Sequence, residues 1–373
     1  MFSLTPTDAQ TGLDRQIRAL AVERLRPQGL AAERERTVTP DLGDELDKLG
    51  RQIHGTPELC DPMSAIIACE ALAFGDPGIA YAVLPAFQVA HLVRTCGSRR
   101  QRERLLPRTA GIWSTATSFM YYEGFGRGQT ELETEAAPTE DGWTISGRKI
   151  AVHHPGVADV SVLLARTAEA GDAPAGLAAF ACDGPPLRCR TESDSWQTGA
   201  LGANVTPTGT VRLNEVTCGG GQRLDVAGVP LHRELGYARL MLAAVLVGAA
   251  GAAVDYAGAY AGERHTFGRP LTSYQGVSFV LVECETKVDS ARLELWEAAQ
   301  RLGELSDPAA IEHLVGRAVR TATNAATQVT REGIQLLGVH GIVTEHPVER
   351  FWRHASTLSL IDFDPLATTL SLV

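Results

Sequence analysis

The pattern of apolar and polar positions changes twice along the chain. From about residue 8 to 110, apolar residues recur at helical spacing, as in DAQTGLDRQIRALAVERL and DPMSAIIACEALAF. Asp61 and Pro62 predict a helix start, because aspartate caps a helix N-terminus and proline suits the first helical position. Pro107 and Gly111 are expected to stop the last helix of the region, in QRERLLPRTAG. The spacing predicts an N-terminal helical domain over residues 1–110.

The middle region, 111–228, has a strand-like pattern. Short runs rich in Val, Ile, Thr and aromatic residues are separated by Gly, Pro and Asp, as in GWTISGRKIAVHH, VADVSVLLART, GLAAFACDG and GTVRLNEV. This spacing predicts an antiparallel β-sheet domain rather than βαβ units. No GxGxxG motif follows a predicted strand, and GGGQRL at 219–224 is interpreted as a flexible loop, which disfavours a Rossmann fold.

Helical periodicity returns in the C-terminal region, 229–373. Short connections between its long segments are typical of an antiparallel helical bundle. Four helices are predicted, near 233–262, 271–303, 307–338 and 345–360. The most apolar run, Leu240 to Val254, is interpreted as too short and too rich in Gly and Ala for a membrane span. We expect a buried helix there, whose small residues let a neighbouring helix approach closely.

Composition excludes several classes of function. The formal net charge is -10, which argues against nucleic acids or an anionic membrane surface as partners. The seven cysteines form no CxxC pair, and His153 has no nearby Cys or Asp at zinc-ligand spacing, so no structural metal is expected. Free cysteines and the lack of a signal-peptide pattern in MFSLTPTDAQ favour a reduced, cytoplasmic compartment.

Four stretches resemble motifs of the acyl-CoA dehydrogenase family, and the resemblance covers nearly the whole chain. ERHTFGRPLTSYQ (263–275) resembles the family's Arg-x-x-Phe-Gly-x-Pro-(x)n-Gln turn. IQLLGVHGIVTEHPVERFWRHA (334–355) resembles its Gln-x-x-Gly-Gly-x-Gly-(x)n-Pro-Val-Glu-Arg-(x)n-Arg-Asp-Ala segment. LGANVTPTGTVRLNEV (201–216) and DGWTISGRKIAV (141–152) resemble two strands of its sheet domain. The resemblance implies an α+β fold in which a helical domain, an antiparallel β domain and a four-helix bundle follow one another.

The resemblance also implies an FAD cofactor that is shared between subunits. In this family the turn around Arg264 belongs to a neighbouring subunit's cofactor site, where the guanidinium meets the FAD pyrophosphate, a geometry that suits its paired donors. Further cofactor contacts are implied at Thr266, Phe267, Gln275, Gln335, Gly338, His153 and Tyr122. The alternative is that 263–275 is a helix–helix turn with solvated charges. His153 replaces a hydroxyl that would donate to flavin N5, and a turn or surface His-His pair is its alternative.

The family's reaction needs a carboxylate that removes the α proton of an acyl thioester while the flavin takes a β hydride. Two positions carry this glutamate in the family. One precedes an arginine that corresponds to Arg239, a substrate-binding residue by the resemblance, and Ala238 leaves that position empty. The other corresponds to Asp362, which is the leading candidate for the catalytic base. Asp364 is the reserve candidate, although Asp364 and Pro365 also fit the start of a short helix with no catalytic duty.

Several residues depart from the family pattern where the flavin and the acyl carrier would bind. Ala151 stands where the family has a tryptophan that covers the flavin, and Asn204 stands where it has an arginine. Val339 replaces a glycine next to the cofactor, and the loop after Tyr122 lacks the family's Gly-Ser-Asp.

Three functions remain open after these departures. The first is a divergent dehydrogenase for an unusual acyl thioester, on CoA or a carrier protein, in a specialised pathway. Its electron acceptor would be an electron-transfer protein or oxygen, and it would form a homodimer or homotetramer. The second is a flavin-poor or redox-silent partner subunit of a hetero-oligomer. The third is a binding or scaffold protein without enzymatic activity.

Overall fold

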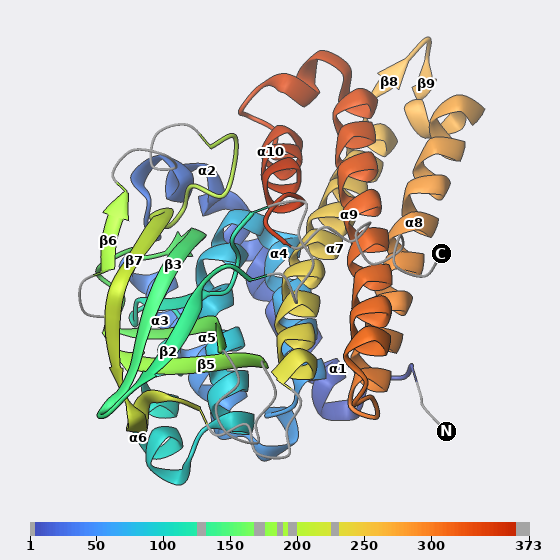
Figure 1. The fold of residues 1–373 in the computed structure, drawn as a ribbon. Helices are drawn as coiled ribbons and strands as arrows, with labels where there is room; N and C mark the ends of the chain where they lie inside the picture. The colour runs from blue at the N-terminus through green and yellow to red at the C-terminus, as the bar shows by residue number, and fades with distance from the viewer. Residues whose placement is uncertain are drawn as a thin grey trace.

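The computed structural model describes residues 4–124, 132–167, 176–184, 189–192, 200–224 and 231–362. Its elements follow the order helices, sheet, helices, so the predicted α+β architecture is confirmed (Figure 1). The N-terminal helices are α1 (Asp8–Leu20), α2 (Arg26–Glu35), α3 (Pro40–Gly55), α4 (Pro62–Gly75), α5 (Pro77–Cys96) and α6 (Arg99–Thr109), with a π-helical turn, Ala21–Leu25, between α1 and α2.

Local sequence explains where these helices begin and end. Asp61 caps α4 by accepting the backbone N–H of Ser64 at 3.0 Å, with Pro62 at the first helical position, as predicted. Asp76 caps α5 in the same way. Pro107 lies inside α6, which ends at Thr109, so the helix ends between Pro107 and Gly111 as expected. A proline removes one N–H donor, and α6 ends within a turn of that loss.

The central domain is a seven-stranded sheet in the order β1-β4-β2-β3-β7-β6, with β5 paired to β4. The strands are β1 (Thr117–Met120), β2 (Glu135–Thr139), β3 (Gly142–His153), β4 (Val160–Thr167), β5 (Gly176–Asp183), β6 (Cys189–Glu192) and β7 (Thr208–Gly219). Most pairs are antiparallel, but β1 and β2 each pair with β4 in parallel, which corrects the purely antiparallel expectation. The GGGQRL stretch contains a 3-10 turn, Gly220–Gln222, where Gln222 accepts the N–H of Gly219 at 2.7 Å.

The C-terminal bundle contains α7 (Leu231–Glu263), α8 (Gln275–Leu302), α9 (Pro308–Leu337) and α10 (Val348–Leu358). These four helices confirm the predicted ones to within a few residues. A short hairpin of β8 (His265–Thr266) and β9 (Arg269–Pro270) joins α7 to α8 and projects from one end of the bundle (Figure 1). The helix α7 packs closely on α4, because a Cβ added at Gly248 would lie 2.3 Å from the backbone oxygen of Glu70.

Two helices of the described chain, α5 and α7, are long and apolar enough to cross a membrane by length and composition. In each, 89% of the most apolar window is buried inside the protein. The run Leu240 to Val254 belongs to a helix of 33 residues, so the argument that it is too short for a span is wrong. Its burial agrees with the predicted core helix, and the absence of a membrane span stays a prediction.

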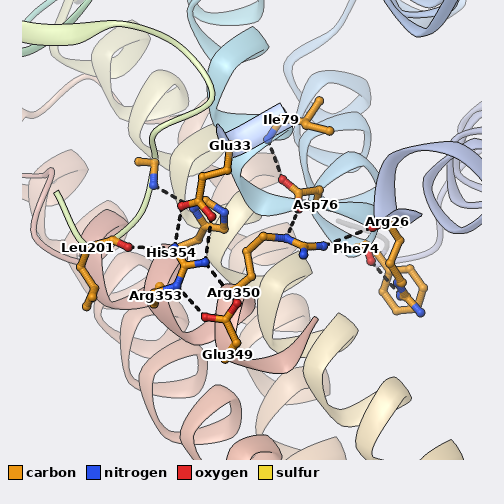
Figure 2. A network of polar contacts seen from close by, with 11 residues as sticks. Arg26, Glu33, Phe74, Asp76, Ile79, Leu201, Glu349, Arg350, Arg353 and His354 are labelled. Carbon is orange, nitrogen blue, oxygen red and sulfur yellow. Dashed lines mark hydrogen bonds and ion pairs between the residues drawn. The ribbon is translucent and has the colours of Figure 1, made fainter. Parts of the chain in front are cut away.

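The helix α10 ties the three regions together through buried ion pairs (Figure 2). Arg350 Nε donates to Asp76 at 2.8 Å, and the other oxygen of Asp76 caps α5 at Ile79. Both side chains of this pair are almost completely buried. Since a buried charge is costly unless it is paired, this contact specifies how α10 lies against the N-terminal helices.

A second set of contacts joins α10 to α2 and to the loop before β7 (Figure 2). Arg353 contacts Glu33 of α2 through two nitrogens at 2.6 and 2.8 Å and also binds Glu349. Arg353 further donates to the Leu201 carbonyl, at 3.0 Å. The buried His354, which replaces the aspartate of the family's Arg-Asp-Ala, accepts the Ala203 N–H through Nδ1 at 2.8 Å.

Candidate functional site

The turn between α7 and α8 is a rigid hairpin that presents its side chains outward. Phe267 and Gly268 have φ values of 52° and 81°, and a tight two-residue hairpin loop requires such positive φ angles. Tyr274 stabilises the turn by donating to the Thr266 carbonyl at 2.7 Å, and the Arg269 guanidinium stacks 4.0 Å from its ring centroid. The backbone is therefore fixed while its tip faces solvent.

The predicted nucleotide-binding residues of this turn are at the surface. Phe267 is 94% exposed, although burying an aromatic ring is normally favourable. Arg264 and Gln275 are exposed as well, and Thr266 is half-buried. An aromatic ring this exposed beside an arginine suits a surface that meets another molecule. Their contact with FAD in a neighbouring subunit stays a prediction.

The second predicted nucleotide-binding segment lies at the same end of the bundle. The helix α9 ends at Leu337, and Gly338 follows with φ 60° and open space where a Cβ would be. Gln335 is exposed, and Val339 points outward with 70% exposure. A side chain at position 339 therefore does not cover Gly338, which removes one objection from the sequence comparison.

Two tyrosine–histidine pairs join these segments. Tyr260, one turn before the hairpin, forms a 3.1 Å hydrogen bond to His340 Nδ1. Tyr256 forms a 2.8 Å hydrogen bond to His346 Nδ1. The contact from Tyr260 to His340 connects the end of α7 with the segment that follows Gly338. The structure thus brings together two stretches that are about 70 residues apart in the sequence.

The leading candidate base, Asp362, lies in the interior against Arg239 of α7. The Nε of Arg239 contacts the two carboxylate oxygens at 3.0 and 2.9 Å, and both residues are buried. Ala238 precedes Arg239, and its carbonyl accepts a 2.9 Å hydrogen bond from the buried Gln88 of α5. Asp362 therefore contacts the residue that directly follows the other position at which the family carries its base. The reserve candidate Asp364 lies outside the described residues.

Two adjacent tyrosines hold the segment that carries Asp362. Tyr121 donates to the Ile361 carbonyl at 3.3 Å, and Tyr122 donates to the Leu360 carbonyl at 2.6 Å. Burial, followed by the negative charge of Asp362, raises the pKa of Tyr121 and Tyr122 above the usual range for tyrosine. Both hydroxyls remain protonated donors, so Asp362 is anchored by its own side chain and by the two residues before it.

The strand β3 forms one wall of this interior and is irregular where the family has its flavin wall. Its register against β7 shifts between Lys149 and Val152, and Ala151 has φ 53°. The N–H of Ile150 donates to the Tyr122 carbonyl at 3.0 Å. This bulge directs backbone rather than a large side chain toward the tyrosines.

A buried ion pair supports the same wall. Lys149 Nζ contacts Glu123 at 2.7 Å, and both side chains are almost fully buried. Burial lowers the pKa of Lys149 to about 8, against the opposing attraction of Glu123. Glu123 also accepts the backbone N–H groups of residues 133 and 134, which fixes both ends of the segment between 124 and 132.

His153 is buried at the end of β3, so a surface His-His pair is not what the structure shows. A turn does follow, in which the His154 carbonyl accepts the N–H of Val157 at 3.1 Å. The Nε2 of His153 lies 3.0 Å from the Tyr81 carbonyl, and because a carbonyl only accepts, Nε2 carries the hydrogen. Burial, with a smaller effect of His154, lowers the pKa of His153 to about 3. The contact of His153 with a flavin stays a prediction.

Sequence reasoning missed part of this interior. Tyr81, Tyr121, Gln88 and Glu123 take part in it, yet none belongs to the motif residues carried over from the family. The adjacent tyrosines at 121 and 122 were a possible signal, because two phenols next to each other are costly to bury without partners. Tyr81 and Gln88 gave no signal within an apolar helix.

The described part of the chain contains no group of three or more His, Cys, Asp or Glu side chains that is arranged to hold a metal ion. It does contain two cavities. A cavity of about 340 Å³ lies beside α1 and α8 and includes Arg18, Arg292 and Trp296. Another of about 470 Å³ lies beside α2 and α10 and includes Glu33 and Arg353. Neither cavity is lined by Arg239 or Asp362.

Comparison with known proteins gives the same family from two parts of the chain. Residues 7–111 match the acyl-CoA dehydrogenase N-terminal domain, and residues 228–362 match the acyl-CoA dehydrogenase C-terminal domain. Glutaryl-CoA dehydrogenase of Desulfococcus multivorans is 26% identical over 80% of this chain and 77% of its own length. The mitochondrial short-chain specific acyl-CoA dehydrogenase of Sus scrofa is 26% identical over 94% and 81%.

A solved structure agrees with this assignment at the level of fold. Butyryl-CoA dehydrogenase from Megasphaera elsdenii superimposes with a TM-score of 0.82 at 23% identity, over 99% of this chain and 98% of that one. The low identities indicate a divergent member. The chain belongs to the acyl-CoA dehydrogenase family, which comprises oxidoreductases that act on CH–CH groups.

Proposed function

We propose that this protein carries out the FAD-dependent α,β-dehydrogenation of an acyl thioester, with Asp362 as the base. The observation that supports this most directly is the position of the Asp362 carboxylate. It lies 2.9 Å from Arg239 Nε, and Arg239 directly follows Ala238, the other position at which the family carries its base. The acyl group would be carried by CoA or by a carrier protein, in a specialised pathway.

The described residues fit an FAD in two respects. The exposed Arg264 stands on a rigid hairpin with donors for a pyrophosphate, and Thr266, Phe267 and Gln275 surround it. In the interior, the Tyr81 hydroxyl is buried with no hydrogen-bond partner among the described residues, which is the environment of a donor that meets a ligand. Tyr122, Ala151 and His153 would form the wall against the flavin ring, and Gln335 and Gly338 would meet the nucleotide. The bound flavin supplies the acceptor for the β hydride.

The remaining chemistry belongs to this chain. Asp362 is an ionised acceptor held by Arg239, and it would receive the α proton of the thioester. Since both oxygens accept from the Arg239 Nε–H, an arriving proton displaces part of that contact. The carboxylate is one methylene shorter than a glutamate. The substrate must therefore approach the backbone of residue 362 more closely than it would with a glutamate at this position.

The assembly and the electron acceptor follow from the family. The exposed turn would complete the cofactor site of a second copy, in a homodimer or homotetramer. An electron-transfer protein or oxygen would reoxidise the flavin, and a cytoplasmic location fits the free cysteines.

The absorption spectrum of the purified protein tests this proposal. A yellow protein that bleaches without oxygen when acyl thioesters are added would support it. A colourless protein that takes up no added FAD, alone and in the presence of acyl-CoA, would contradict it.

A second candidate is a flavin-poor partner subunit in a hetero-oligomer. The observation that favours it is that the interior side chains already have protein partners, while the turn around Arg264 faces outward. Arg239 pairs with Asp362, and Tyr121 and Tyr122 donate to the carbonyls of Ile361 and Leu360. Such a chain would donate its turn to the flavin site of a different family member. It would be colourless alone and would co-purify with flavin only when that second chain is present.

A further inference from the structure

Tyr81 of α5 carries a buried hydroxyl group that no described residue satisfies. The residue is 2% exposed, and its Oη has no hydrogen-bond partner among the described residues. Its backbone carbonyl, by contrast, is bound by His153. Buried polar groups in folded proteins nearly always find a partner, so an isolated phenol hydroxyl needs an explanation.

The neighbouring tyrosines sharpen this observation. Tyr121 and Tyr122 lie in the same interior, and each donates its hydroxyl hydrogen to a backbone carbonyl of the segment before Asp362. Buried tyrosine hydroxyls in this interior can therefore find acceptors within the protein. Tyr81 differs because no acceptor atom of the described residues forms a hydrogen bond with its hydroxyl.

The contacts of Tyr81 place it at the wall of the candidate site. Its ring centroid lies 4.3 Å from that of His153 on β3. Burial and the nearby hydroxyl of Tyr122 raise the pKa of Tyr81, and Tyr81 in turn contributes to the raised pKa of Tyr121. The three hydroxyls are thus within electrostatic range of one another, and that of Tyr81 is a neutral donor at any physiological pH.

We propose that Tyr81 Oη donates a hydrogen bond to an acceptor atom of the ligand bound in this site, either an oxygen of the acyl thioester or an acceptor atom of the flavin ring. This inference rests on the proposed function and assigns a positioning residue to it. Its acceptor arrives with the ligand, which explains why no described residue accepts a hydrogen bond from this hydroxyl. A ligand with an acceptor at this place is favoured over one that presents only hydrocarbon.

The substitution Tyr81→Phe tests the proposal through two effects of opposite sign. Without its ligand the variant should be as stable as the wild type or more stable, because it removes an unsatisfied buried hydroxyl. Binding should weaken by about 5- to 10-fold, the usual size of one ordinary hydrogen bond. If the acceptor belongs to the thioester, KM rises while flavin retention is unchanged. If it belongs to the flavin, the dissociation constant of FAD rises.

Tyr121→Phe is the matched control, because it removes a hydroxyl that donates to the Ile361 carbonyl. Its melting temperature should fall by a few degrees. If Tyr81→Phe is destabilised to the same extent, the hydroxyl has a protein partner and the inference is wrong. The inference is also wrong if the wild type binds flavin and turns over thioester, and Tyr81→Phe does both equally well. A wild type that binds neither ligand contradicts the proposed function itself.

Discussion

The turn around Arg264 and the interior around Arg239 each present an arginine, but in opposite environments. Arg264 is exposed at the base of a hairpin whose tip carries a phenylalanine that is 94% exposed. Arg239 is 1% exposed and contacts a carboxylate of its own chain. An exposed guanidinium is free to meet a partner at little cost to folding, whereas a buried one needs its carboxylate to remain in the core.

The two halves of the candidate site therefore differ in whether another molecule is needed to complete them. The hairpin is completed by another molecule, and its residues can change without loss of the fold. The interior is built by the chain alone, so that residues with a catalytic role also carry stability. Substitutions in the two regions should therefore have effects on stability and on activity that can be told apart.

The largest effect is expected for Asp362→Asn. If Asp362 is the base, the rate of flavin reduction by an acyl thioester should fall about 100- to 10,000-fold, while FAD stays bound. Stopped-flow absorbance without oxygen measures this rate. Asp362→Glu is the control because it keeps a carboxylate and should retain a measurable rate. Reduction at the wild-type rate in Asp362→Asn would mean that another group removes the proton.

The next effect concerns stability in the buried network of α10. Asp76→Ala removes both the cap of α5 and the partner of the buried Arg350, and the free energy of unfolding should fall by about 3–5 kcal/mol. Urea denaturation measures the change. Glu103→Ala breaks the exposed pair with Arg99 and should cost less than about 1 kcal/mol. Equal losses of unfolding free energy in the two variants would mean that the buried pair contributes no more to stability than the exposed one.

A smaller effect follows from the pKa of His153, which is lowered from 6.5 to about 3. The unfolded chain binds a proton at this residue below about pH 6.5 and the folded chain does not, so stability is lost as pH falls from 6.5 toward 3. At pH 5 the loss from this residue is about 2 kcal/mol. Unfolding of wild type and His153→Gln between pH 7 and 5 should show a shallower pH dependence in the variant, whereas His265→Gln, exposed on the hairpin, should match the wild type. Parallel curves for His153→Gln and wild type would contradict the shift.

The helices could be predicted from sequence because their apolar positions follow one rule over many residues, and α7 to α10 lie within a few residues of the expected ranges. Asp362 could be named as a candidate base from its fixed spacing to a motif, and its catalytic role stays a prediction. The parallel pairing of β1 and β2 with β4 could not be predicted, because the short strands β1 and β2 were not recognised. Whether the Tyr81 hydroxyl has a hydrogen-bond partner depends on side chains from other elements. The sequence of α5 alone therefore could not predict it.

The smallest effect on the folded chain is expected at the hairpin, with Arg264→Ala. Its exposed side chain should contribute less than about 0.5 kcal/mol to the stability of the flavin-free protein. Flavin retention should nevertheless weaken by about 10- to 100-fold, as expected when a charge-assisted contact to a pyrophosphate is lost. Equilibrium dialysis with FAD measures the second quantity, and thermal unfolding of the flavin-free protein measures the first. Arg269→Ala is the control on the same hairpin, because its guanidinium stacks on Tyr274. Unchanged flavin retention in Arg264→Ala would remove the turn from the cofactor site and leave it as a connection between α7 and α8.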